Sequence, residues 1–290
     1  MRLARLTIAA ALTLSLAACA DSPAERNDAS IDVTAGLYPL AFVAREVGGE
    51  HISVTSLAAP GVEPHDLELS PAAVRSLGQS NLVLHIGGFQ PAVDAAIDST
   101  EARAIDAATA LPLRDAPSGE GIDPHFWLEP GMLSKYAKVL SAEFARLDPE
   151  NADAYAANAA TLAGSLEGLH QRYLDGLEQC ERRELITTHE AFQYLAVAYG
   201  LEQVGIAGTD PDAEPSPARI REISDLVAAS GATTIFAESD ASKAVAESVA
   251  RDAGVEVAVL SPLETVADGE DYFSIMERNL ETIRKALDCD

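Results

Sequence analysis

The sequence has few positive charges and few cysteines. Its 20 lysines and arginines stand against 46 aspartates and glutamates, which gives a formal net charge of −26. Such a surface repels the phosphates of nucleic acids, so we expect no nucleic acid partner. The three cysteines form no C-x-x-C pair. This excludes a thiolate zinc site of that type and a thioredoxin-like redox pair.

Long apolar runs and familiar catalytic motifs are also missing. One sustained apolar run, at residues 6–18, is too short to span a bilayer, and no later run is longer. Neither a G-x-S-x-G nucleophile elbow nor a G-x-x-x-x-G-K-[ST] phosphate loop occurs. The sequence therefore gives no support to a serine hydrolase of that type or to a P-loop nucleotidase.

The amino terminus has the form of a secretory leader. Arg2 and Arg5 precede the apolar run, and Leu16-Ala17-Ala18-Cys19 ends it with small residues. This ending resembles a bacterial lipobox, which implies a signal peptide at residues 1–18 and acylation of Cys19. Polar and small residues follow, so residues 19–30 are expected to form the lipid anchor and a flexible tether. The alternative is ordinary cleavage, with Cys19 incidental.

The mature chain is long enough for about two domains. Strand and helix patterns alternate over residues 31–86 and again over residues 185–287, which predicts α/β folding with mostly parallel sheets. Between them, Tyr155, Leu162, Leu166, Leu169 and Tyr173 recur at helical spacing. We therefore expect an amino-terminal lobe (31–147), a long rigid connecting helix (148–179) and a carboxy-terminal lobe (180–290).

Two cysteines remain besides Cys19. In an exported protein, Cys180 and Cys289 are candidates for a disulfide that ties the start of the second lobe to the chain end. Two independent thiols are the alternative, because spacing alone does not decide the pairing.

Three of the six histidines lie in short motifs far apart in the chain. They are Pro64-His65-Asp66, Asp123-Pro124-His125-Phe126-Trp127 and Thr188-His189-Glu190. His65 and His189 follow predicted strands, as does Glu264, and ligands of open parallel sheets bind at the carboxyl ends of strands. Three imidazoles and a carboxylate are a four-coordinate set that suits Zn²⁺, whereas Mn²⁺ prefers more oxygen ligands. We expect one metal site in the cleft between the lobes.

These motifs, together with Pro60-Gly61-Val62-Glu63-Pro64 before His65 and with Pro262-Leu263-Glu264, resemble the solute-binding lipoproteins of zinc and manganese ABC importers. The resemblance covers essentially the whole mature chain. It implies a monomeric receptor, anchored outside the cell membrane by lipid, that captures a metal ion and delivers it to a permease. It also implies His65, His125, His189 and Glu264 as ligands.

Details of the motifs favour zinc. Manganese members of the family tend to carry a carboxylate where this chain has His189, and aspartate where it has Glu264. The histidine-rich loop of many zinc members is missing around residues 115–122. Glu63 and Glu238 are expected to orient imidazoles, although either residue or a water remains an alternative fourth ligand.

Two other functions remain open. A manganese-binding member of the same family is one of them. A secreted zinc hydrolase is the other, because His189-Glu190 begins like H-E-x-x-H, but position 193 is glutamine. Nothing in the sequence specifically indicates a surface adhesin. We therefore predict a binding protein and no enzyme, with metal release on docking or on protonation of the imidazoles.

Overall fold

The computed structural model describes residues 30–290 except 60, 118, 120, 209–214, 239–242 and 268. The predicted signal peptide, Cys19 and all but the last residue of the tether lie outside the described residues. Within the described part, no helix combines the length and the apolar character needed to cross a membrane.

Two parallel four-stranded sheets organise the chain. The first half contains β1 (Ile31–Ala35), α1 (Tyr38–Gly48), β2 (Ile52–Ser56), α2 (Pro71–Gln79), β3 (Leu82–His85), α3 (Pro91–Thr100), β4 (Ala104–Asp106), α4 (Ala107–Ala110) and α5 (Pro130–Leu147). After α6 (Ala152–Leu177), the second half contains β5 (Glu184–Thr187), α7 (Gln193–Ala198), β6 (Glu202–Gly205), α8 (Pro217–Ser230), β7 (Thr234–Ala237), α9 (Lys243–Ala253), β8 (Glu256–Val259) and α10 (Tyr272–Leu287). Short 3₁₀ turns, η1 (Gly49–His51), η2 (Phe126–Leu128) and η3 (Pro149–Asn151), complete the described elements.

Prolines and serines fix where several helices begin. Ser70 and Ser216 cap α2 and α8, and each is followed by a proline in the first turn. The hydroxyl of Ser70 accepts from the backbone N–H of Ala73 at 3.2 Å, and the hydroxyl of Ser216 accepts from that of Arg219 at 3.2 Å. The cap satisfies an N–H that has no partner in the helix, and proline needs no partner there. The sequence predicts helices at 71–78 and 217–229, and both begin at the predicted residue.

The two sheets have the same topology. Their strand orders are β2-β1-β3-β4 and β6-β5-β7-β8, and every described pairing is parallel. The chain reverses direction across each sheet between its first and third strands, that is, between β1 and β3 and between β5 and β7. Ligand sites of open sheets form at the carboxyl end of such a reversal. The topology therefore directs attention to the loops that follow these strands.

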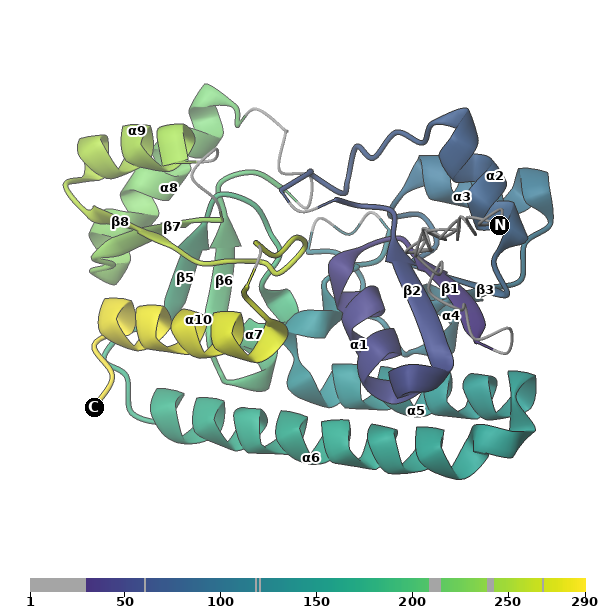
Figure 1. Ribbon diagram of the computed structural model, residues 1–290. Helices are drawn as coiled ribbons and strands as arrows, with labels where there is room; N and C mark the ends of the chain where they lie inside the picture. Colours follow the sequence, from purple (N-terminus) through teal and green to yellow (C-terminus); the bar gives the residue numbers. More distant parts are fainter. Residues whose placement is uncertain are drawn as a thin grey trace, which may run out of the picture.

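The long helix α6 lies along both lobes (Figure 1). Its 26 residues correspond to about 39 Å. It is shorter than the predicted range of 148–179, because Pro149–Asn151 forms a 3₁₀ turn. The sequence also predicts Asp148 as the helix cap, which is wrong: Asn151 occupies that position. The carboxylate of Asp148 instead accepts from the hydroxyl of Tyr155 at 2.7 Å.

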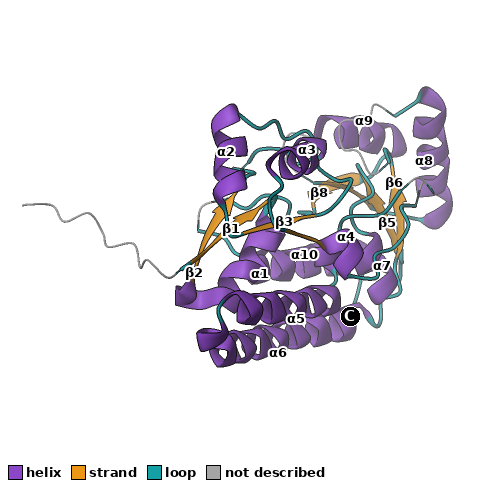
Figure 2. Ribbon diagram, turned by 90° about the vertical axis from the view of Figure 1, so that its right-hand side faces the viewer, coloured by secondary structure: helices purple, strands orange, loops and turns teal. Residues whose placement is uncertain are grey.

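Helices cover both faces of each sheet (Figure 2). The largest hydrophobic core runs without a break from α1 and α5 through α6 to α10, so both lobes share it. Smaller cores lie under α2 and α3 and under α8 and α9. A disulfide joins Cys180 to Cys289 across 109 residues and ties the end of α6 to the end of α10. The predicted fold class, two parallel α/β lobes joined by a long helix, is confirmed.

Candidate metal centre

His65 lies in the loop that follows β2, and a buried glutamine holds this loop. The side-chain amide of Gln90, which is 2 % exposed, donates to the carbonyl of Pro64 at 3.0 Å and to that of Gly36 at 3.3 Å. Gly36 directly follows β1, and a Cβ there would approach the Gln90 amide oxygen to 2.4 Å. The His65 loop is therefore tied to the end of the first sheet through Gln90, which a side chain at Gly36 would displace.

His125 is fully buried, directly before η2. Asp123 Oδ1 accepts from the backbone N–H of His125 at 3.0 Å and lies 2.7 Å from its Nδ1. A carboxylate on Nδ1 fixes the proton there and leaves Nε2 free as a metal ligand. Nε2 lies 3.1 Å from Glu264 Oε1.

His189 lies two residues after the end of β5 and is 1 % exposed. Glu238, at the end of β7, accepts from the backbone N–H of His189 at 2.9 Å and from the Thr188 hydroxyl. Glu238 Oε1, which accepts from the backbone N–H, also lies 3.2 Å from Nδ1 of His189. Neither ring nitrogen of His189 makes a hydrogen bond of good geometry to a described residue. A buried nitrogen in that state is suited to a metal ion.

Glu264 brings the three imidazoles together. Its Oε1 lies 3.2 Å from Nε2 of His65, 3.1 Å from Nε2 of His125 and 3.7 Å from Nε2 of His189. All four donor atoms lie within 4.8 Å of one another. In a tetrahedral zinc site with bonds of about 2.0–2.1 Å, donor atoms are about 3.3 Å apart. The separations therefore fit a single Zn²⁺ among them.

Buried charges dominate the electrostatics of this cluster. Burial alone lowers the pKa of His189, but the carboxylates of Glu238 and Glu264 outweigh it and raise this pKa to about 10. The pKa of His125 is raised despite complete burial, because Asp123 and Glu264 favour its charged form. Burial raises the pKa of Glu264, but hydrogen bonds from His125 and His65 and the nearby ring of His189 bring it well below its usual value. Without metal, the cluster therefore holds protons on imidazoles beside ionised carboxylates.

All four predicted ligands meet at one point, contributed by both halves of the chain. The other histidines lie elsewhere: the ring of His51 packs edge-on against Tyr155, His85 Nδ1 lies 2.9 Å from Asp94, and His170 Nδ1 lies 3.1 Å from the Tyr199 hydroxyl. Glu63 contacts the backbone that carries one of the predicted ligands: its carboxylate accepts from the backbone N–H of His65 at 3.1 Å.

Sequence reasoning assigned no role to Asp123 or Gln90. The Asp-Pro-His spacing is a signal for Asp123, because it lets the carboxylate reach the ring of His125 two residues later. Gln90 has no such local signal, because it acts on a loop 26 residues earlier in the chain.

Comparisons with known proteins agree with this arrangement. The family model described as ZnuA, zinc-uptake complex component A, periplasmic, matches residues 33–286. The zinc-binding lipoprotein AdcA of Streptococcus pneumoniae serotype 4 is 30 % identical over 99 % of this chain, which spans 62 % of that protein. The high-affinity zinc uptake system protein ZnuA of Bacillus subtilis is 28 % identical, with 97 % of both chains covered.

Among solved structures, the Zn(II)-bound ZnuA-like domain of Streptococcus pneumoniae AdcA superimposes with a TM-score of 0.78 at 32 % identity. The match covers 89 % of this chain and 99 % of that domain.

Proposed function

Because this chain belongs to the ZnuA family of zinc-uptake components, we propose that it captures Zn²⁺ outside the cytoplasm and delivers it to the permease of an ABC importer. His65, His125, His189 and Glu264 are the ligands in this proposal. Relatives named as zinc-binding or zinc-uptake proteins support zinc as the cargo.

The convergence of four donor atoms within 4.8 Å of one another carries the proposal. Three neutral imidazoles and one carboxylate match the nitrogen-rich set that zinc accepts in four-coordinate sites. Asp123 and Glu238 contact the Nδ1 atoms of His125 and His189, which directs the opposite nitrogens inward. Such prior orientation lowers the cost of ordering the ligands around the ion.

Elemental analysis of the purified protein tests the assignment. Protein loaded from a mixture of divalent metals is expected to retain one zinc per chain. The triple variant His65→Ala, His125→Ala and His189→Ala is expected to retain none. The control is the triple variant His51→Ala, His85→Ala and His170→Ala, which removes the other three histidines of the sequence. Stoichiometric zinc in the first variant would show that the site is wrongly assigned.

The lipid anchor belongs to the same proposal. The lipobox-like sequence before Cys19 supports acylation of that residue and attachment to the outer face of the cell membrane. Cys19→Ala is expected to abolish labelling by a radioactive fatty acid and to release the protein from the membrane. We further propose that the receptor acts as a monomer. Size-exclusion chromatography with light scattering tests this, and a stable dimer would contradict it.

We also propose that the protein is not an enzyme. In the motif H-E-x-x-H, both histidines lie on one helix. Here His189 and Glu190 precede α7, which begins at Gln193, so they share no helical face. A zinc-loaded sample is expected to hydrolyse neither ester nor peptide substrates, and turnover that is lost with the ligands would contradict this. Manganese is the less suitable cargo, because three of the four donors are nitrogen.

A further inference from the structure

The turn that delivers Glu264 has a strained backbone. Leu263, directly before Glu264, has a φ of 59° and is fully buried. Residues with a side chain rarely adopt this left-handed conformation, and a leucine keeps it only where its surroundings enforce it. The turn follows β8 and leads toward α10, so the structure must contain contacts that hold it.

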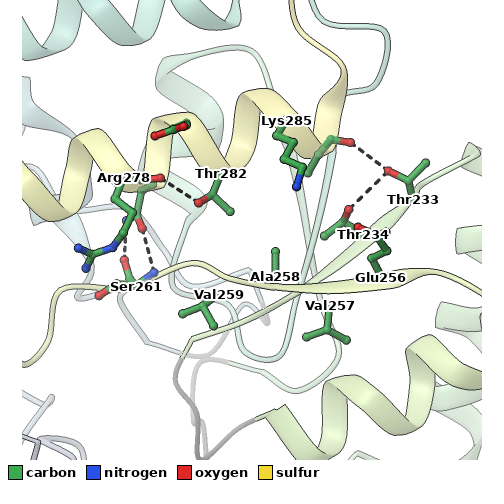
Figure 3. A pocket seen from close by; sticks show the side chains of 13 residues that line it. Thr233, Thr234, Glu256, Val257, Ala258, Val259, Ser261, Arg278, Thr282 and Lys285 are labelled. Atoms are coloured by element: carbon green, nitrogen blue, oxygen red, sulfur yellow. Dashed lines mark hydrogen bonds between the residues drawn. The ribbon is translucent and has the colours of Figure 1, made fainter.

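Three of these contacts lie within the carboxy-terminal lobe and come from the side chains of two residues, Asn279 and Ser261. Asn279 on α10 is 1 % exposed, and its side chain accepts from the backbone N–H of Ser261 at 3.0 Å and donates to the Ser261 carbonyl at 2.7 Å. The Ser261 hydroxyl then accepts from the backbone N–H of Leu263 at 3.2 Å. Figure 3 shows Ser261 where the chain leaves β8, bonded to α10 in the lining of a groove of about 490 Å³. Asn279 and Ser261 therefore hold the first half of the turn.

The remaining contact crosses between the lobes. The indole N–H of Trp127 donates to the carbonyl of Pro262 at 2.7 Å, and both groups are buried. The hydroxyl of Tyr272 on α10 donates to the carbonyl of Trp127 at 2.8 Å. Trp127 lies two residues after His125, and Pro262 lies two residues before Glu264. The bond between Trp127 and Pro262 therefore joins the backbone segments that carry two of the proposed ligands.

We propose that Trp127 is a positioning residue for metal binding, because its bond to Pro262 holds the turn at 261–264 so that the Glu264 carboxylate reaches the three histidines. The inference rests on the proposed zinc-binding function. Without the indole donor, the backbone of the turn loses its hydrogen bond to the amino-terminal lobe, and Leu263 can relax toward an ordinary conformation. Glu264 then leaves the position where its oxygen meets all three imidazoles.

Two variants and a matched control test the role of Trp127. Trp127→Phe removes the donor but keeps a ring, and Ser261→Ala removes the acceptor for the Leu263 N–H with minimal change in volume. The control is Tyr173→Phe. The Tyr173 hydroxyl is also a buried donor to a backbone carbonyl, that of Met276 on α10, at 2.6 Å, but it does not contact the turn. All three variants lose one hydrogen bond, and the first two affect Glu264.

The measurements are zinc affinity by competition with a chelator, the visible absorption of bound Co²⁺, and the melting temperature of the metal-free protein. Trp127→Phe is expected to weaken zinc binding about 10- to 100-fold, as for other residues that orient ligands, and to reduce the strong absorption typical of four-coordinate Co²⁺. Ser261→Ala is likewise expected to weaken zinc binding and to reduce the Co²⁺ absorption. Tyr173→Phe is expected to lower only the melting temperature.

Equal loss of zinc affinity in Trp127→Phe and Tyr173→Phe, or an unchanged Co²⁺ spectrum in Trp127→Phe, would overturn the positioning role. If Trp127→Phe does not fold, Ser261→Ala decides, and an unchanged spectrum there also overturns it. Wild-type protein that binds neither zinc nor cobalt refutes the proposed function and this inference with it. A failure confined to the variants refutes the inference alone.

Discussion

Zinc binding is expected to release protons, because His189 holds one firmly in the metal-free protein. Its pKa of about 10 means that at pH 7 the neutral, metal-binding imidazole is about 1000-fold less populated than the protonated form. Coordination requires that neutral form. Removing the proton at pH 7 therefore costs about 4 kcal/mol of the gross binding free energy. The raised pKa of His125 adds to this cost.

The sign of the effect follows directly. As pH rises from 7 toward 10, less proton has to be displaced, so the apparent zinc affinity is expected to rise by about tenfold per pH unit from His189 alone. Calorimetric titration with zinc at pH 7, in two buffers of different ionisation enthalpy, measures the number of protons released. Identical binding heats after correction for buffer–metal binding, or a zinc affinity that stays flat between pH 5 and 7.5, would refute the reasoning.

A matched pair of variants tests whether the Glu238 carboxylate holds the proton on His189. Glu238→Gln removes one of the two carboxylates that raise the pKa of His189, so this variant is expected to release fewer protons per zinc. Asp94→Asn removes the carboxylate 2.9 Å from His85, outside the metal centre, and is expected to release as many as the wild type. Equal proton release in all three proteins would mean that Glu238 does not hold the proton.

Three further outcomes are expected. In the metal-free protein, protonated His125 and His189 stabilise the fold fully below pH 6.5, and this contribution is lost as pH rises toward 10. Ionised Glu264 contributes above pH 4.5, and its contribution is lost as pH falls, so the melting temperature is expected to be highest between about pH 4.5 and 6.5. A melting temperature that rises from pH 7 to 9 would contradict this. Reduction of the bond between Cys180 and Cys289 is expected to lower the free energy of unfolding by about 2–5 kcal/mol, because it releases a loop of 109 residues, and denaturant unfolding with and without reductant measures the loss. Gln90→Leu is expected to weaken zinc binding about tenfold, because it frees the His65 loop, and chelator competition showing wild-type affinity would count against that role.

Local sequence patterns predict much of the fold. The apolar spacing of the sequence predicts helices at 243–253 and 272–287, and these ranges coincide with α9 and α10. Residues 91–147 are different: α3, β4, α4 and the 18-residue α5 were not predicted. The strand Ala104–Asp106 has only three residues and gains its identity from pairing with β3. Such an element has too little sequence of its own to be read without its partner.

Some features of the candidate metal centre can likewise be predicted from local sequence, and others cannot. The ligand types follow from the motifs, and the strand ends predict that His65, His189 and Glu264 lie near one another. The contacts of Gln90, Trp127 and Asn279 cannot be predicted from the motifs, because each joins residues that are distant in the chain and adjacent only after folding. Leu263 is the clearest case, because its left-handed backbone contradicts its local preference. Local rules are expected to fail where tertiary contacts fix a site.

The buried charges explain how one fold accommodates both the metal-free and the zinc-bound state. Asp123, Glu238 and Glu264 are all buried, and they bring three negative charges into the centre when ionised. With His125 and His189 both protonated, the formal charge of these groups is minus one. With both imidazoles neutral and one Zn²⁺ bound, it is again minus one. Buried carboxylates without compensating charge are strongly destabilising, so the protons stabilise the arrangement until zinc replaces them. The net charge of the buried centre is therefore the same whether protons on the imidazoles or one divalent ion balance the carboxylates.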